Sequence, residues 1–190
     1  MLDKVFIDAQ SLLMDSYRLA AQIEASGFIP NFIVGVWRGG TPVGIAVQEF
    51  FEYMGHDTDH ISIRTSSYDG MNRQERDVRV HGMDYIIRNI NSEDRLLIVD
   101  DVFDTGLSVD AIIRHLAERA RKNMPETRIA TAYYKPTKNR TERIPDYYVH
   151  ESADWLVFPH ELVGMSKEEL EQHKPGFLDI VASVRPVVVS

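Results

Sequence analysis

Residues 96–108, LLIVDDVFDTGLS, restrict the fold of this chain more than any other segment. Four apolar residues, Leu96 to Val99, form a run typical of a short buried strand. A polar turn with three acids follows, and helical spacing of apolar residues begins at Leu107. A strand that leads through a turn into a helix is the repeating unit of parallel α/β sheets. The segment therefore predicts a strand at 96–99, a turn at 100–106 and a helix at 107–121.

The same succession of strands and helices recurs along the chain. Further strands are predicted at 32–36, 60–67, 129–134, 146–150 and 155–158. Further helices are predicted at 8–26, 42–53 and 82–90. The first of these helices is expected to bury Leu12, Leu13, Ser16, Leu19, Ala20 and Ile23. Asp69 to Val80 has no apolar face and is predicted to be a long mobile loop. Together these elements predict a mostly parallel, twisted α/β sheet flanked by helices, with right-handed crossovers.

The composition is that of a globular protein with one domain. The chain has 190 residues, of which 44% are hydrophobic and 26% charged, enough to bury a substantial core. It contains no cysteine, which excludes disulfides and thiolate metal sites. The net charge of −8 disfavours nucleic acid as a partner because its phosphates would be repelled. No apolar run approaches the roughly 20 residues of a membrane span, and the start, MLDKVFIDAQ, lacks a secretory signal. We therefore expect a cytoplasmic protein without a membrane partner.

The turn at 100–106 carries groups suited to a sugar phosphate. Ligands of open parallel sheets bind at the carboxyl ends of strands, beside helix N-termini. Backbone N–H groups of residues 104–108 and the hydroxyls of Thr105 and Ser108 can donate to a phosphate. Gly106 allows the backbone to approach closely, and neighbouring carboxylates suit the hydroxyls of a polyol or Mg²⁺. The alternative is an ordinary surface turn whose Asp and Thr side chains make local hydrogen bonds.

The string VDDVFDTGLS is similar to the signature of type I phosphoribosyltransferases that binds phosphoribosyl diphosphate (PRPP). Trp37 to Gly40, WRGG, resembles the pyrophosphate-binding loop of that family, which often has a cis peptide before its arginine. Ser66 to Asp69, SSYD, resembles the mobile catalytic loop of the xanthine-guanine branch. YYKP at 133–136 and DWLVFPHE at 154–161 resemble the purine-recognition elements of that branch. The matched segments span about residues 30–161.

The resemblance implies a role for each residue of the signature. Asp104 is expected to be the catalytic general base, which accepts a proton at purine N7. Asp100 and Asp101 are expected to contact the ribose hydroxyls and Mg²⁺, with Glu161 as a further metal-binding acid. The implied PRPP-binding set is Asp100, Asp101, Asp104, Thr105, Gly106, Leu107 and Ser108.

The other matched segments imply contacts with pyrophosphate and with the base. Pyrophosphate is assigned to Arg38, Gly39, Gly40, Ser67 and Tyr68. Lys135 is expected to donate a hydrogen bond to purine O6, which would favour 6-oxopurines over adenine. Trp155 is expected to stack on the purine, and backbone groups around Leu156 to pair with the ring edge. For Trp37, packing in the core is the favoured interpretation.

The leading hypothesis is a Mg²⁺-dependent purine salvage enzyme. It would transfer ribose 5-phosphate from PRPP to hypoxanthine, guanine or xanthine and release pyrophosphate. The alternatives are a regulatory protein of the same fold that binds PRPP or a nucleotide without turnover, and a phosphoribosyltransferase for another base. The resemblance further implies one domain over 1–190, with a core at about 28–135 and a small purine-recognition hood from the N-terminal and 136–190 segments. It also implies a homodimer or homotetramer.

Overall fold

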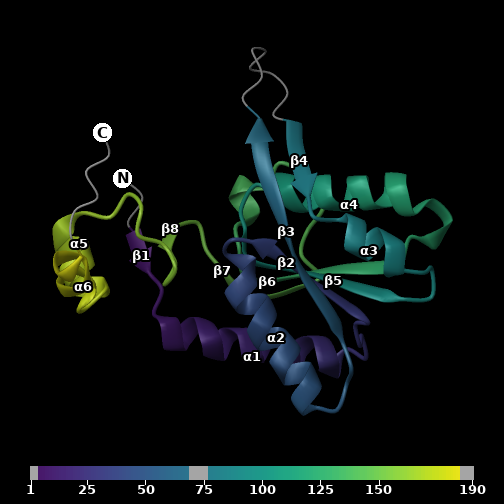
Figure 1. Cartoon of the computed structure of the whole chain (residues 1–190), viewed down its shortest axis with the longest axis horizontal. Helices are drawn as coiled ribbons and strands as arrows, with labels where there is room; N and C mark the ends of the chain where they lie inside the picture. The colour runs from purple at the N-terminus through teal and green to yellow at the C-terminus, as the bar shows by residue number, and fades with distance from the viewer. Residues whose placement is uncertain (1–3, 69–76, 185–190) are drawn as a thin grey trace. The chain divides into compact units, whose positions relative to one another are not determined.

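The computed structural model describes residues 4–68 and 77–184, with the backbone alone for Ser67, Tyr68 and Asp77 (Figure 1). The chain divides into two units by its internal contacts. The larger unit is Gln10–Ala153, and the smaller unit combines Met1–Ala9 with Asp154–Ser190.

The larger unit is built on a six-stranded sheet with the order β4-β3-β2-β5-β6-β7. Its strands are β2 (Phe32–Trp37), β3 (Asp59–Tyr68), β4 (Asp77–His81), β5 (Arg95–Phe103), β6 (Glu126–Tyr134) and β7 (Tyr147–Glu151). All neighbouring strands are parallel except β3 and β4, which are antiparallel. The predicted mostly parallel α/β sheet is therefore confirmed.

Strand β4 corrects the predicted loop at 69–80. Residues 69–76 lie outside the described part of the chain, but 77–80 belong to β4 and pair with the end of β3. Val78 and Val80 alternate there with polar residues, which is the two-residue period of a strand. The alternation is short and lies next to many charged residues, so it was not recognised as a strand. Pairing with β3 supplies the backbone hydrogen bonds that fix this segment as a strand.

Helices cover both faces of the sheet (Figure 1). On one side lie α1 (Ala9–Ala25) and α2 (Gly40–Tyr53), and on the other lie α3 (Asp84–Asn89) and α4 (Leu107–Ala120). Two short 3₁₀ helices are η1 (Arg121–Asn123) and η2 (Pro136–Lys138). The larger unit includes β7 and all of α1 after Ala9, although both elements lie outside the core predicted at about 28–135.

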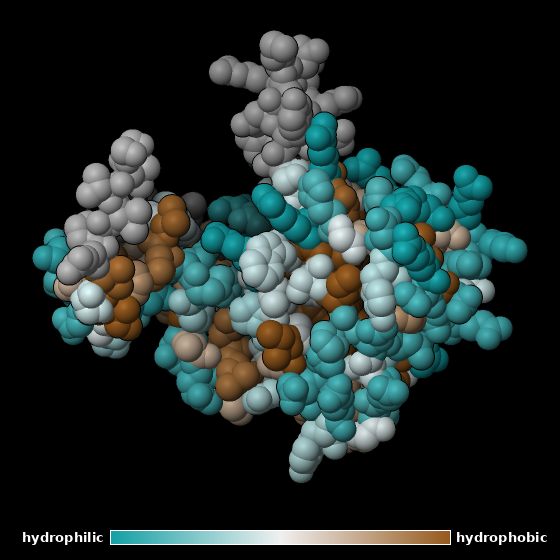
Figure 2. Space-filling view, in the orientation of Figure 1, coloured by the Kyte–Doolittle hydropathy of each residue, from teal (hydrophilic) through white to brown (hydrophobic). Residues whose placement is uncertain are grey.

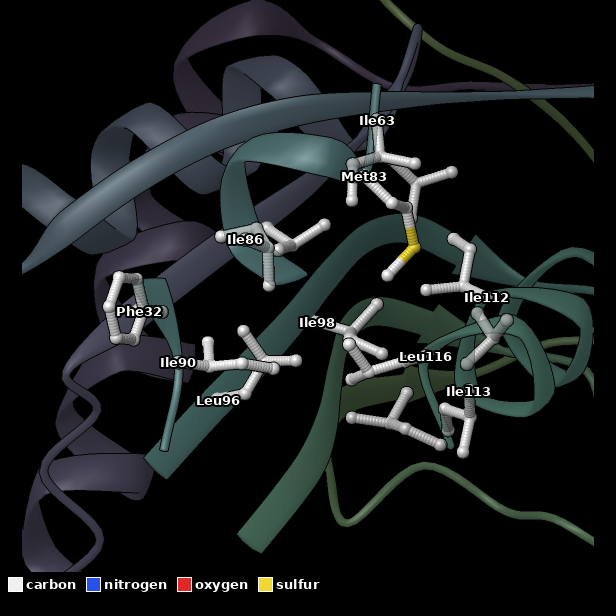
Figure 3. Close-up of a cluster of buried hydrophobic side chains, with 14 of the residues drawn as sticks. Phe32, Ile63, Met83, Ile86, Ile90, Leu96, Ile98, Ile112, Ile113 and Leu116 are labelled. Atoms are coloured by element: carbon white, nitrogen blue, oxygen red, sulfur yellow. The ribbon is translucent and has the colours of Figure 1, made fainter. Parts of the chain in front are cut away.

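One hydrophobic core lies between the sheet and the helices α3 and α4 (Figure 3). Alternate residues of the central strands face this side, as expected for the two-residue period of a strand. They meet apolar residues spaced by three and four positions on α4. The residues that Figure 3 labels are Phe32, Ile63, Met83, Ile86, Ile90, Leu96, Ile98, Ile112, Ile113 and Leu116.

Helix α1 differs from its predicted face at two positions. Leu13 is 37% exposed, whereas Asp15 is buried at 3%. Asp15 tolerates burial because its carboxylate accepts hydrogen bonds from Arg18 Nη1 at 2.6 Å and His150 Nε2 at 2.8 Å. An acid was not expected on the buried face, since its partner His150 comes from a distant part of the sequence.

The smaller unit contains a two-stranded parallel sheet and two helices. Its elements are β1 (Lys4–Phe6), β8 (Trp155–Val157), α5 (Lys167–His173) and α6 (Phe177–Ser183). Figure 2 shows apolar residues among polar ones over α5 and α6, where Ile180 and Val181 are at least half exposed. Within the described part of the chain, no helix has both the length and the apolar composition of a membrane span.

Candidate active site

The acidic segment lies at the carboxyl end of β5. Asp100 and Asp101 belong to the strand and not to the predicted turn, because the ladder to β6 continues through the pair Val102–Tyr133. Only residues 104–106 connect β5 to α4. The carboxylates therefore stand on a hydrogen-bonded strand, which fixes their positions better than a free turn would.

The connection between β5 and α4 has the features of a phosphate site. Gly106 adopts the left-handed conformation with φ of 76°, and no side chain caps the helix N-terminus. The N–H of Leu107 lies 3.5 Å from Thr105 Oγ1, a long contact that an anion could replace. A helix N-terminus without a side-chain cap offers backbone donors and a partial positive charge.

Thr65 is a residue near this connection that the sequence did not indicate. Its Oγ1 donates to Ser108 Oγ over 3.3 Å. Strand β3 continues beyond the end of β2 at Trp37, so Thr65 reaches the N-terminus of α4 although another strand separates β3 from β5. The polar residues at the end of the predicted strand at 60–67 could have suggested a ligand-binding role. Which residue they contact depends on the order of strands in the sheet, which the sequence does not show.

Gly39 and Gly40 bring the loop after β2 against the acids of β5. A Cβ atom on Gly39 would lie 1.9 Å from Asp101 Oδ2, and one on Gly40 would lie 2.3 Å from the Val99 carbonyl oxygen. Neither position has room for a side chain. Two segments matched to the family therefore meet at the carboxyl ends of β2 and β5.

The residues before these glycines are open to solvent. The peptide bond between Trp37 and Arg38 is cis, as the resemblance implies. Arg38 is exposed. Trp37 is 51% exposed, so the expectation of core packing was wrong. Trp37 is the last residue of β2, and the five strand residues before it are all buried.

Burial raises the pKa of the Asp100 carboxyl well above its usual value, and the charge of Asp101 raises it further. Hydrogen bonds from the backbone N–H groups of Asp101 and Gly40 act in the opposite direction and do not offset these effects. The adjacent Asp101 carboxylate accepts from the Val102 N–H at 2.8 Å. Two crowded carboxylates, one of which ionises with difficulty, form a site where a cation would relieve the repulsion.

Replacing Asp100 with Asn should stabilise the metal-free protein at high pH. Because the folded-state pKa is raised, the folded protein holds this proton more tightly than the unfolded chain, and that stability is lost as pH rises through the folded pKa. We expect the melting temperature in EDTA at pH 8 to rise by roughly 2–4 °C, which corresponds to about 1 kcal/mol at this chain length. The difference should shrink at pH 4. The exposed Asp57→Asn serves as the control, and an equal gain at both pH values would contradict the assignment.

Asp104 and Lys135 form an ion pair beside the connection to α4. Lys135 Nζ lies 3.4 Å from Asp104 Oδ2, and the two side chains are 5% and 40% exposed. The backbone explains the pairing, because the Lys135 N–H donates to the Phe103 carbonyl at 2.9 Å. The candidate base and the candidate O6 donor are therefore brought together, with the carboxylate on the solvent side.

A segment between η2 and β7 packs against the same connection. The Arg140 N–H donates to the Thr105 carbonyl at 3.0 Å, and Arg143 Nε donates to Asp110 Oδ1 at 2.8 Å. A Cβ atom on Gly106 would lie 2.7 Å from Thr141 Oγ1. This packing was not predicted because it joins polar residues of two segments without a periodic pattern.

The remaining predicted residues lie in β3 and in the smaller unit. The backbones of Ser67 and Tyr68 lie in β3. Trp155, Leu156 and Glu161 belong to the smaller unit. The Glu161 carboxylate accepts from the Phe158 N–H at 2.9 Å. In residues 4–68 and 77–184, no three His, Asp or Glu side chains are close enough to hold a metal ion.

Comparison with known families gives a match over most of the chain. Residues 6–163 match the family model of the phosphoribosyl transferase domain. The chain belongs to this family. The resemblance inferred from the sequence is thereby confirmed, and the phosphoribosyltransferase fold is the α/β sheet described above. No curated protein matches the chain significantly.

Solved structures extend the comparison. A purine phosphoribosyltransferase from Pyrococcus horikoshii Ot3 is 26% identical, with a TM-score of 0.66 over 87% of this chain and 99% of its own. A hypothetical protein from Neisseria gonorrhoeae with bound ppGpp is 17% identical, with a TM-score of 0.71 over 93% and 98% of the two chains. The Helicobacter pylori xanthine-guanine-hypoxanthine phosphoribosyltransferase is 20% identical, with a TM-score of 0.66 over 82% and 92%. The last two likenesses show the fold.

Proposed function

We propose that this phosphoribosyltransferase transfers ribose 5-phosphate from PRPP to a 6-oxopurine and releases pyrophosphate. One observation carries the proposal: Asp104 and Lys135 stand side by side, 3.4 Å apart, next to an uncapped helix N-terminus and two crowded carboxylates. The likeness to the Pyrococcus horikoshii purine phosphoribosyltransferase supports it.

The paired acceptor and donor match one edge of a 6-oxopurine. N7 and O6 are neighbours along that edge, so a carboxylate and an ammonium group side by side can contact both. Asp104 would accept the proton that the ring must lose, and its negative charge would stabilise the cationic ribosyl centre. Lys135 would donate to O6. Adenine has an amino group at that position, which cannot accept this hydrogen bond and would place a donor against the buried ammonium group.

The sugar phosphate would occupy the ends of β2 and β5. The 5-phosphate would accept hydrogen bonds from the backbone of 104–108 and from the hydroxyls of Thr105 and Ser108. The ribose hydroxyls would donate to Asp100 and Asp101. Pyrophosphate would lie at Arg38 and the loop formed by Gly39 and Gly40, neither of which has room for a side chain, with Ser67 and Tyr68 as further contacts.

The carboxylates of Asp100 and Asp101 fit Mg²⁺. This ion is usually held by one or two carboxylates, water and substrate phosphates instead of a cage of protein ligands. This mode of binding agrees with a site formed by two carboxylates, since the described residues contain no cluster of three or more metal-binding side chains. When bound, Mg²⁺ would neutralise charge on the departing pyrophosphate. Glu161 as a further ligand stays a prediction from the resemblance, as does the homodimer or homotetramer.

The purine ring would stack on Trp155, with backbone groups near Leu156 at its edge. Trp155 is 54% exposed, so its indole is available to a ligand. Aromatic stacking is tolerant of ring substituents and supplies affinity without choosing among the 6-oxopurines.

Product formation tests the function directly. The protein is incubated with PRPP, MgCl₂ and one base at a time, and nucleotide is quantified by chromatography. We expect nucleotide from at least one of hypoxanthine, guanine and xanthine, and far less from adenine. Product from adenine alone would contradict the role of Lys135. PRPP binding without product from any base would favour a regulatory protein, and product from a pyrimidine alone would favour the third hypothesis.

A further inference from the structure

The indole of Trp155 is covered on one face by Lys4. Trp155 and Lys4 are direct partners in the parallel pairing of β8 with β1, so their side chains lie on the same side of this small sheet. The ammonium group of Lys4 lies 5.2 Å from the centre of the indole ring. This distance is within the range of a cation–π contact. One indole face is thus occupied by a charge of the same unit.

Lys4 is itself held in place. Its Nζ lies 2.9 Å from both carboxylate oxygens of Glu169 and donates to the Gly164 carbonyl at 3.2 Å. The hydrogen bond from Lys4 lowers the pKa of Glu169, so the pair stays ionised. The two side chains are each only 25% exposed, which limits screening by solvent.

Glu169 is fixed by α5. Its carboxylate also accepts from the Ser166 N–H at 2.8 Å, which closes a capping box at the start of the helix. One turn later on the same helix, the His173 ring stacks on Phe6 of β1 with ring centres 3.7 Å apart. Helix α5 therefore contacts β1 at two places, and both contacts lie on one helix face because they are four residues apart.

We propose that Lys4 is a positioning residue for base binding, which orients the Trp155 indole so that its other face receives the purine. The proposal rests on the function proposed above. It gives a role to β1 and α5, which contain none of the matched motifs. These two elements hold Lys4 over Trp155. A tryptophan ordered before the base arrives loses less conformational entropy on binding, and affinity rises accordingly.

The substitution Lys4→Met tests this inference. Met keeps the length of the side chain but removes the charge. We expect the KM for the base to rise roughly 3- to 10-fold, the change that ordering one side chain typically accounts for. The KM for PRPP and kcat at saturating base should stay unchanged. The variant Lys4→Arg should have the same base KM as the unmodified protein, because an arginine can contact both the indole and Glu169.

A matched control comes from α5. Lys167 lies 3.9 Å from Glu171, both side chains are at least 60% exposed, and no contact joins it to Trp155 in the described structure. Lys167→Met should leave every kinetic constant unchanged. Equal effects of Lys4→Met on the base KM, the PRPP KM and kcat would indicate a general loss of structure and overturn the proposal. Failure of Lys4→Arg to restore the base KM would overturn it as well.

A second readout does not need turnover. Protein labelled with 5-fluorotryptophan gives two ¹⁹F signals, which Trp37→Phe assigns, and Lys4→Met should shift or broaden the Trp155 signal alone. If no base is converted to nucleotide, the proposed function fails, and titration with a 6-oxopurine mononucleotide decides this inference separately. At least threefold weaker binding in Lys4→Met would support it. Unchanged binding would overturn it.

Discussion

Asp104→Asn is expected to reduce kcat by roughly 10²- to 10⁴-fold, the usual contribution of a positioned general base. Asn keeps the size of the side chain and can still accept a hydrogen bond from Lys135, which lies 3.4 Å from the carboxylate. It cannot accept the purine proton and carries no charge to stabilise the ribosyl cation. PRPP affinity should change by tenfold or less, about 1.4 kcal/mol, since the phosphate donors of the connection are untouched.

Single-turnover kinetics and calorimetric titration with PRPP separate these two effects. The control is Asp110→Asn in the first turn of α4, where the carboxylate pairs with Arg114 and Arg143. It removes an equal charge near the connection without touching the proposed proton acceptor, and turnover should fall much less. If Asp104→Asn weakens PRPP binding as strongly as it slows turnover, Asp104 is a binding residue and not the base.

Gly40→Ala should abolish PRPP binding at practical concentrations, a loss of about 100-fold or more. The added Cβ would lie 2.3 Å from the Val99 carbonyl oxygen and 2.8 Å from Asp100 Cα, and both neighbours are backbone atoms of β5. The end of β5 or the loop after β2 must therefore move. A displacement of about 1 Å at a binding site can cost 100-fold in function, and overpacking typically costs 1–3 kcal/mol of stability.

Gly44→Ala is the matched control on the same helix. Its Cβ would lie 3.5 Å from Gly35 Cα, an ordinary contact. In a helix interior, alanine is more stable than glycine by up to about 1 kcal/mol. PRPP affinity, measured by calorimetry, should stay unchanged in this variant, and the melting temperature should not fall. Normal PRPP binding by Gly40→Ala would show that the loop after β2 and the acids of β5 do not act as one site.

The sequence predicted the parallel α/β sheet and the place of its candidate site because both depend on local patterns. Apolar runs and helical spacing mark β2, β5 and α4 without reference to the rest of the chain. Acids at the end of β5, followed by hydroxyls and a glycine, indicate a ligand with phosphate and hydroxyl groups for the same reason. The family resemblance also assigned Asp104 and Lys135 to one reaction, although their positions are 31 residues apart.

Only the tertiary structure decided which distant groups meet. Three contacts join residues that no periodic pattern relates: Gly39 with Asp101, Thr65 with Ser108, and Lys4 with Trp155. The extension of β5 through both acids, and β4 itself, depend on pairing with neighbouring strands. Periodicity reports which face of one segment is buried, whereas strand order and side-chain contacts arise from packing the whole chain, so residue spacing alone could not predict them.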